Sequence, residues 1–168
     1  MNQKLARLLR WTKKTPSPLP PAGQDPVTIF VVSWGRPIYL WVCLDALFRM
    51  THSPRRVILL DNAHPDPGVG EVIEAFERRG LFSEVVRFST NTHENLRRAY
   101  RERLEGIGPS HVFMESDTVI CDRSSCWLAE MSAIMERNPQ IGMLGSLIDT
   151  DLKNVDLEIP SGLFTAIT

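Results

Sequence analysis

Two carboxylates, two residues apart, follow a short apolar stretch in the second half of the chain. Residues 111–114 (H-V-F-M) have the β-prone character of a buried strand, which ends on Glu115-Ser116-Asp117. Ligands of open parallel sheets bind at the carboxyl ends of the strands, and carboxylate oxygens suit hard divalent ions such as Mg²⁺ or Mn²⁺. Glu115 and Asp117 are therefore candidate metal ligands. The alternative interpretation is a polar strand end that is merely solvated.

Two other predicted strands also end on side chains that can bind a ligand. Residues 27–33 (V-T-I-F-V-V-S) are almost without polar interruption, as in a strand covered on both faces, and Trp34 follows them. Residues 56–60 predict a second strand, which Asp61 and Asn62 follow. In a doubly wound sheet these strand ends can meet the acidic one in a single crevice. The structural alternatives are that Trp34 covers the core and that Asp61 caps a turn.

Strands and helices alternate along the chain to position these groups. The alternation predicts an α/β fold, with a mostly parallel sheet and helices on both faces. Residues 63–70 are rich in proline and glycine and predict a loop, in which His64 is interpreted as a solvated histidine, with a ligand role as the alternative. The predicted strands are 27–33, 56–60, 83–88, 111–114 and 141–148, and the predicted helices are 37–50, 71–79, one that follows the capping residues 90–95, and 127–137.

The two ends of the chain differ in composition from the predicted domain, which spans residues 27–148. Residues 1–14 are typical of a basic amphipathic helix, and two interpretations stay open: a weak peripheral anchor on anionic lipid at the inner face of the membrane, or a solvated extension. Residues 15–26 contain five prolines and predict a stiff, extended linker. Residues 149–168 show no clear pattern.

The overall composition narrows the class of protein. Of 168 residues, 43% are hydrophobic and 23% charged, as in an ordinary globular domain. A formal net charge of −1 argues against a nucleic-acid partner. The three cysteines form no C-x-x-C pair, so a reducing cytoplasm is the expected location. No Walker A loop is present and no G-x-G-x-x-G follows the first strand, which disfavours the nucleotide-binding folds that carry those motifs.

Several short motifs, in order, resemble those of a known family. They are V-x-I-F-V-V-S-W-G-R-P (27–37), V-I-L-L-D-N (57–62), F-M-E-S-D-T-V-I (113–120), a helix that begins at a tryptophan (127–137) and I-G-M-L-G-S (141–146). Together they are similar to the N-terminal half of a family 2 glycosyltransferase, over roughly residues 27–148. The resemblance implies a GT-A fold and the transfer of a sugar from a nucleotide-diphosphate donor to an acceptor.

The resemblance also implies a role for each matching residue. An aromatic ring after the first strand stacks on the nucleotide base, and an acid after the second strand accepts a hydrogen bond from it. The acids of the D-x-D-like triplet, Glu115 and Asp117, hold Mg²⁺ or Mn²⁺ at the diphosphate of a UDP- or dTDP-type donor. The implied nucleotide-binding residues are Ser33, Trp34, Arg36, Asp61, Asn62 and Asn95.

Three features depart from the family pattern. Glu115 stands where the triplet usually begins with aspartate, and Asn95-Leu96-Arg97 replaces the usual N-x-G run. The acceptor half of the fold, which carries the catalytic base in inverting members, is expected to be missing, so no catalytic base is assigned. A catalytically silent or truncated nucleotide-sugar-binding module is therefore the alternative to an active transferase.

Overall fold

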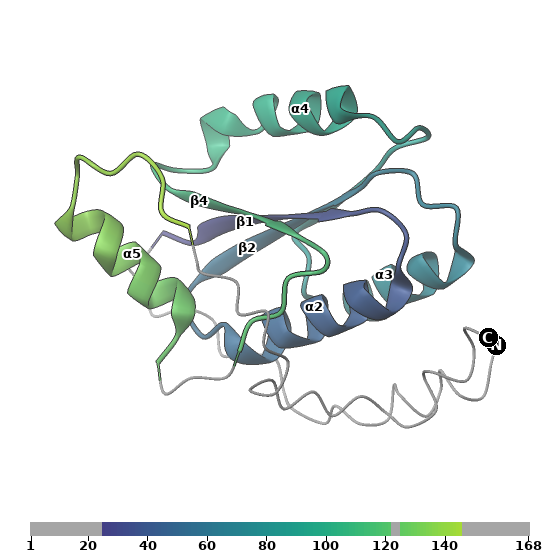
Figure 1. Ribbon diagram of the computed structural model, residues 1–168, viewed down its shortest axis with the longest axis horizontal. Coiled ribbons are helices and arrows are strands. Elements are labelled where there is room, and N and C mark those ends of the chain that lie inside the picture. The colour runs from purple at the N-terminus through teal and green to yellow at the C-terminus, as the bar shows by residue number, and fades with distance from the viewer. Residues whose placement is uncertain (1–24, 122–124, 146–168) are drawn as a thin grey trace.

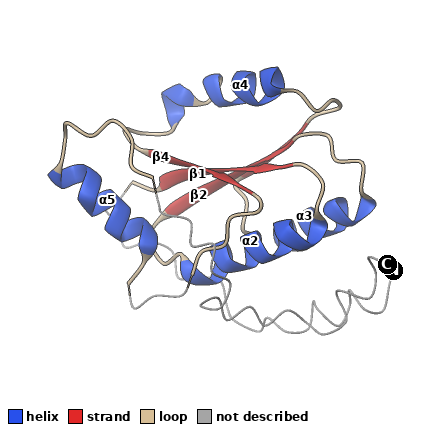
Figure 2. Ribbon diagram, viewed as in Figure 1, coloured by secondary structure: helices blue, strands red, loops and turns tan. Residues whose placement is uncertain are grey.

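The computed structural model describes residues 25–121 and 125–145. They form a four-stranded, all-parallel sheet in the order β3-β2-β1-β4, with helices connecting the strands (Figure 2). The predicted α/β class and parallel sheet are confirmed. The predictions for residues 1–14, for most of the linker and for residues 149–168 lie outside the described residues. The strands are β1 (Val27–Ser33), β2 (Arg55–Asp61), β3 (Glu84–Arg87) and β4 (His111–Glu115).

Helices cover both faces of the sheet, as predicted. α2 (Pro37–Met50) and α3 (Pro67–Arg78) lie on one face, and α4 (His93–Arg101) lies on the other (Figure 1). The chain moves outward from β1 to β3 and then returns to the far side of β1, so right-handed crossovers place α4 opposite α2 and α3. A short 3-10 helix (Leu104–Gly106) precedes β4, and α5 (Trp127–Arg137) follows it. No helix within the described residues is long and apolar enough to cross a membrane.

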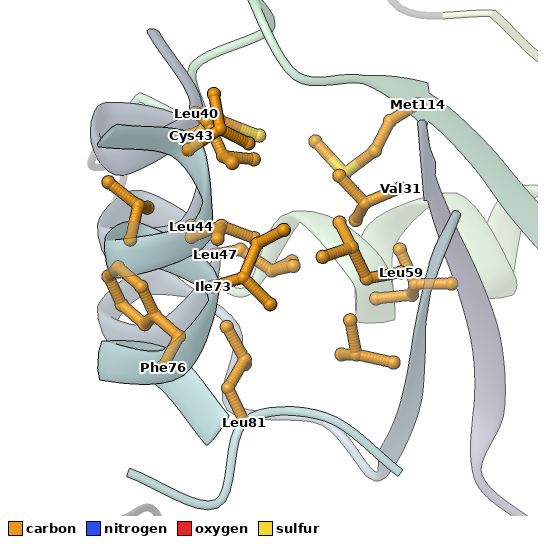
Figure 3. Close-up of a cluster of buried hydrophobic side chains, with 14 of the residues drawn as sticks. Val31, Leu40, Cys43, Leu44, Leu47, Leu59, Ile73, Phe76, Leu81 and Met114 are labelled. Atoms are coloured by element: carbon orange, nitrogen blue, oxygen red, sulfur yellow. The ribbon is translucent and has the colours of Figure 1, made fainter. Parts of the chain in front are cut away.

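Two apolar layers hold the helices against the sheet. Alternate side chains of the central strands enter opposite layers: Val31 and Leu59 pack under α2 and α3, whereas Phe30 and Leu60 pack under α4. Full burial of one large apolar side chain stabilises the fold by roughly 1.5–3 kcal/mol. Figure 3 shows the first layer, in which Leu40, Cys43, Leu44, Leu47, Ile73 and Leu81 face Val31, Leu59 and Met114, and Phe76 packs among the helices.

Helix α3 begins earlier than the sequence pattern predicts. Residues 67–70 belong to the helix, although their proline and glycine content predicts a loop. The Asp66 side chain caps the helix by accepting a hydrogen bond from the Gly68 amide at 2.8 Å. Pro67 occupies the first turn, where its missing N–H costs nothing. The predicted loop is therefore wrong in its second half, because capping and a first-turn proline outweigh the low helix propensity of glycine.

The predicted fifth strand, 141–148, is wrong in the part that the structure describes. Residues 141–145 form no strand, and residues 146–148 lie outside the described range. Gly142 and Gly145 interrupt this apolar stretch, and glycine weakens a strand because it has no side chain to pack. The side chain of Met143 is 88% exposed. Among the described strands, β4 therefore forms one edge of the sheet.

Candidate functional site

The carboxyl ends of β1, β2 and β4 lie side by side. β1 is paired with β2 and β4 on either side, which places Ser33 opposite Asp61 and Val32 opposite Glu115. Backbone hydrogen bonds continue past the strand ends, from the Asn62 amide to the Ser33 carbonyl at 2.8 Å and from the Ser116 amide to the Val32 carbonyl at 3.0 Å. The sheet thus brings the polar strand ends that the sequence singled out to a single edge. In open α/β sheets this is the edge at which ligands bind.

The Asp61 side chain is enclosed and is hydrogen-bonded to His64. Its side chain is only 3% exposed, and its Oδ1 lies 2.7 Å from Nδ1 of His64. The interpretation of His64 as a solvated loop histidine is therefore wrong, because the chain turns back at Ala63 (φ 57°) and places the imidazole on the carboxylate. The spacing Asp61-x-x-His64 is a sequence signal for this contact, and in the structure one of the two intervening residues, Ala63, adopts a left-handed conformation.

Asp117 is bonded to an arginine from the turn after β1. Nη1 of Arg36 lies 3.4 Å from Asp117 Oδ2, and both side chains are largely exposed. Arg36 adopts a left-handed conformation (φ 53°, ψ 66°) immediately before α2, directly after Gly35 (φ 64°). An exposed ion pair of this kind contributes only about 0–1 kcal/mol to stability. The contact therefore places a cation beside the acidic strand end without securing the fold.

Within the described residues, Arg36 and Ala63 are the non-glycine residues with positive φ. They sit in the turns after β1 and β2, which border the same edge of the sheet. A left-handed non-glycine residue costs of order 1–3 kcal/mol and such residues cluster at functional sites. The strained turns therefore coincide with the candidate site.

Trp34 and Glu115 emerge at this edge as exposed groups. The side chain of Trp34 is 53% exposed, so the alternative in which it covers the core is wrong. Along β4, Val112 and Met114 pack in the layer under α2, whereas Phe113 lies 6.1 Å from the Tyr100 ring of α4. Glu115 shares the face of Phe113 because side chains alternate along a strand.

The donor atoms at this edge fit a hard divalent ion only if a ligand supplies more of them. No group of three or more histidine, cysteine or acidic side chains that could hold a metal lies in residues 25–121 and 125–145. Mg²⁺ is usually bound by one or two carboxylates together with substrate phosphates. Glu115 and Asp117 are the carboxylates that the end of β4 offers for an ion of this kind.

The remaining predicted nucleotide ligands are engaged in different ways. The Ser33 hydroxyl is buried and has no hydrogen-bond partner among the described residues. Asn62 bonds through its side chain to the Asn91 side chain and the Thr92 amide, which ties the end of β2 to the loop before α4. The Asn95 amide group donates to the carbonyl of Thr90 at 2.6 Å. The structure thus joins Ser33, Asp61 and Asn62 at adjacent strand ends, whereas Asn95, in the first turn of α4, bonds to Thr90 in the loop before that helix.

Cys43 of α2 and Cys126, which precedes α5, are expected to differ strongly in reactivity. Burial, and then the charge of Asp117, raise the pKa of the Cys43 thiol to about 12. Burial also raises the pKa of Cys126, but hydrogen bonds from Ser53 and from backbone amides outweigh it and lower that pKa to about 7. The thiolate is the reactive form, so at pH 8 iodoacetamide should alkylate Cys126 and leave Cys43 intact, and the rate at Cys126 should rise through pH 7. Mass spectrometry of the peptides after timed labelling measures this, and equal labelling of both thiols would contradict it.

The site is thus defined by four strand-end groups, Trp34, Asp61, Glu115 and Asp117, together with the two basic side chains that contact the acids, Arg36 and His64. Its strand-end side chains are an exposed indole, an enclosed carboxylate and two exposed carboxylates. No protein-family model matches this chain, and no curated protein sequence matches it either.

Proposed function

We propose that this domain binds a nucleotide-diphosphate sugar at the carboxyl edge of its sheet and acts in the transfer of the sugar to an acceptor. The observation that carries the proposal is the pairing of Ser33 with Asp61 and of Val32 with Glu115, next to an exposed Trp34. This arrangement supports the roles that the resemblance to family 2 glycosyltransferases implies for these positions. A UDP- or dTDP-type donor is the proposed ligand.

In this proposal the nucleotide base lies against Trp34 and Asp61. An exposed indole offers a face on which a base can stack, and such stacking contributes about 1–3 kcal/mol per base. Asp61 is enclosed by its neighbours, so a hydrogen bond to its carboxylate is shielded from water. Hydrogen bonds to charged groups are worth about 1.5–3 kcal/mol, more than those between neutral partners. Stacking supplies affinity and the carboxylate supplies selection among bases.

The diphosphate lies in this proposal against Glu115, Asp117 and Arg36. The two carboxylates hold Mg²⁺ or Mn²⁺, and the guanidinium of Arg36 adds positive charge beside them. The metal, when bound, supplies Lewis-acid neutralisation of the leaving diphosphate. The acceptor hydroxyl oxygen forms the new bond to the anomeric carbon, the bond from that carbon to the diphosphate oxygen breaks with its electron pair, and a general base takes the hydroxyl proton.

Calorimetry with UDP-glucose and dTDP-glucose in the presence of MnCl₂ tests the proposal. Saturable binding that EDTA abolishes is the expected result. Trp34→Ala should weaken it about 5- to 150-fold, the equivalent of the 1–3 kcal/mol of stacking. Met143→Ala removes another exposed apolar side chain, outside the site, and should leave binding unchanged.

The outcome of the same titrations decides what kind of protein this is. No metal-dependent binding at millimolar nucleotide would refute the proposal. Binding without transfer of labelled sugar to any acceptor, in assays on the full chain, would identify a donor-binding module rather than an active transferase.

A further inference from the structure

The contact with His64 involves only one of the two carboxylate oxygens of Asp61. Oδ1 of Asp61 bonds to Nδ1 of His64 at 2.7 Å. Oδ2 forms no hydrogen bond with the part of the chain that the structure describes. It is also not one of the fully buried polar side-chain atoms that lack a hydrogen-bond partner. An ionised carboxylate only accepts hydrogen bonds, so the proton in this contact is carried by Nδ1. Oδ1 of Asp61 therefore has a partner, and Oδ2 is the oxygen to which a ligand could donate.

The local fold holds His64 in this position from both sides. The left-handed residue Ala63 reverses the chain directly after β2, so that the imidazole returns over the strand end. The first turn of α3 lies against the far side of the ring, where a Cβ placed on Gly70 would be 3.7 Å from His64 Nε2. The side chain of His64 is only 19% exposed. This enclosure restricts the rotation of the imidazole and, through it, of the Asp61 carboxylate.

We propose that His64 determines base specificity by restricting Asp61 to a single accepting oxygen. This inference rests on the proposed nucleotide site. Uracil and thymine present one imide N–H between two carbonyl groups, which matches one free oxygen. Guanine presents two adjacent N–H donors that pair best with both oxygens of a carboxylate. Cytosine and adenine place a ring-nitrogen lone pair beside their amino group, which the carboxylate repels. The site thereby selects uridine and thymidine diphosphates.

His64 is a positioning residue in this account, because it acts on the base through Asp61. Its removal should therefore change the ratio of affinities for two bases, whereas general loosening of the site would weaken both equally. Asparagine at this position keeps a donor near the place of Nδ1, and glutamine places its donor near that of Nε2. Comparing His64→Asn with His64→Gln therefore shows whether the preference needs the hydrogen bond to Asp61 or only a polar side chain at this position.

The test measures the affinities of UDP and GDP in MnCl₂ for the full chain and its variants. The unaltered chain should prefer UDP, and His64→Ala should reduce the ratio of the two affinities about tenfold. His64→Asn should retain most of the preference, and His64→Gln should lose it. His52→Ala makes the same substitution in an exposed histidine at the opposite end of the sheet, before β2, and should leave the ratio unchanged.

The outcomes separate this inference from the proposed function. An unaltered chain that binds neither nucleotide overturns both. A chain that binds UDP with a preference over GDP that His64→Ala leaves intact overturns the role of His64 and leaves the nucleotide site standing. If His64→Ala fails to fold, equal preferences in His64→Asn and His64→Gln overturn the inference in the same way.

Discussion

Replacing Asp117 by asparagine is expected to weaken Mn²⁺-dependent nucleotide binding by at least about a hundredfold. Removing a residue that only hydrogen-bonds to a metal ligand typically lowers metal affinity about 10–100-fold. Removing a charged ligand itself should lower it at least as much. The fold should be unaffected, because the ion pair of Asp117 with Arg36 is exposed and such pairs contribute only about 0–1 kcal/mol. Asparagine keeps the shape of the side chain, so the charge is the property under test.

Calorimetry with UDP and MnCl₂ measures this effect, and thermal unfolding monitors the fold in parallel. Asp25→Asn is the matched control, because Asp25 is an exposed aspartate that precedes β1 at the opposite end of the sheet. Binding by Asp117→Asn that equals the binding of this control would show that Asp117 holds no metal. If the unsubstituted chain binds UDP equally well in EDTA, its nucleotide binding does not depend on a metal.

Replacing Phe76 by alanine is expected to destabilise the domain by about 3–5 kcal/mol. Phe76 of α3 is fully buried (Figure 3). The centre of its ring lies 5.0 Å from that of Trp41. The guanidinium of Arg79 lies 4.6 Å from the centre of the same ring. Burial lowers the pKa of Arg79, so the substitution leaves a cavity beside a cation that is already partly desolvated.

Urea unfolding followed by circular dichroism measures this loss of stability. Phe113→Ala removes the same side chain from a position that is 53% exposed on β4, and it should cost less than about 1 kcal/mol. Similar losses in the two variants would mean that the layer between α3 and the sheet is not the tightly packed core of the domain. A full loss of structure in Phe76→Ala would leave Phe76→Leu as the variant that measures the packing term.

The elements of this fold were largely predictable because their signals are local. The uninterrupted β-branched run of residues 27–33 predicts a buried central strand, and β1 has those bounds. Pro37 and the apolar stripe after it predict a helix to Met50, and α2 ends there. The weaker pattern of residues 83–88 reflects the partly exposed position of this strand at the edge of the sheet, and the strand in the structure is shorter, Glu84–Arg87.

Predictions failed where one local signal opposed another. Glycines within residues 67–70 indicate a loop, but the Asp66 cap and Pro67 start the helix there. Apolar residues at 141–145 indicate a strand, but nothing in the sequence identifies a neighbour to complete the pairing of their backbone. A strand is stable only when its hydrogen bonds and its faces are satisfied by other strands.

The candidate site was also predictable only where its signals are local in the sequence. The sequence by itself determined which strand ends carry the candidate site residues, because an apolar run that stops on Trp34, on Asp61 or on Glu115 and Asp117 is a local pattern. Only the tertiary structure decided that β1 lies between β2 and β4, which places those ends together. Only the tertiary structure, likewise, set His64 on Asp61 and Arg36 on Asp117. These contacts depend on strand order and on left-handed turns, and both are selected by the packing of the whole domain rather than by the residues nearby.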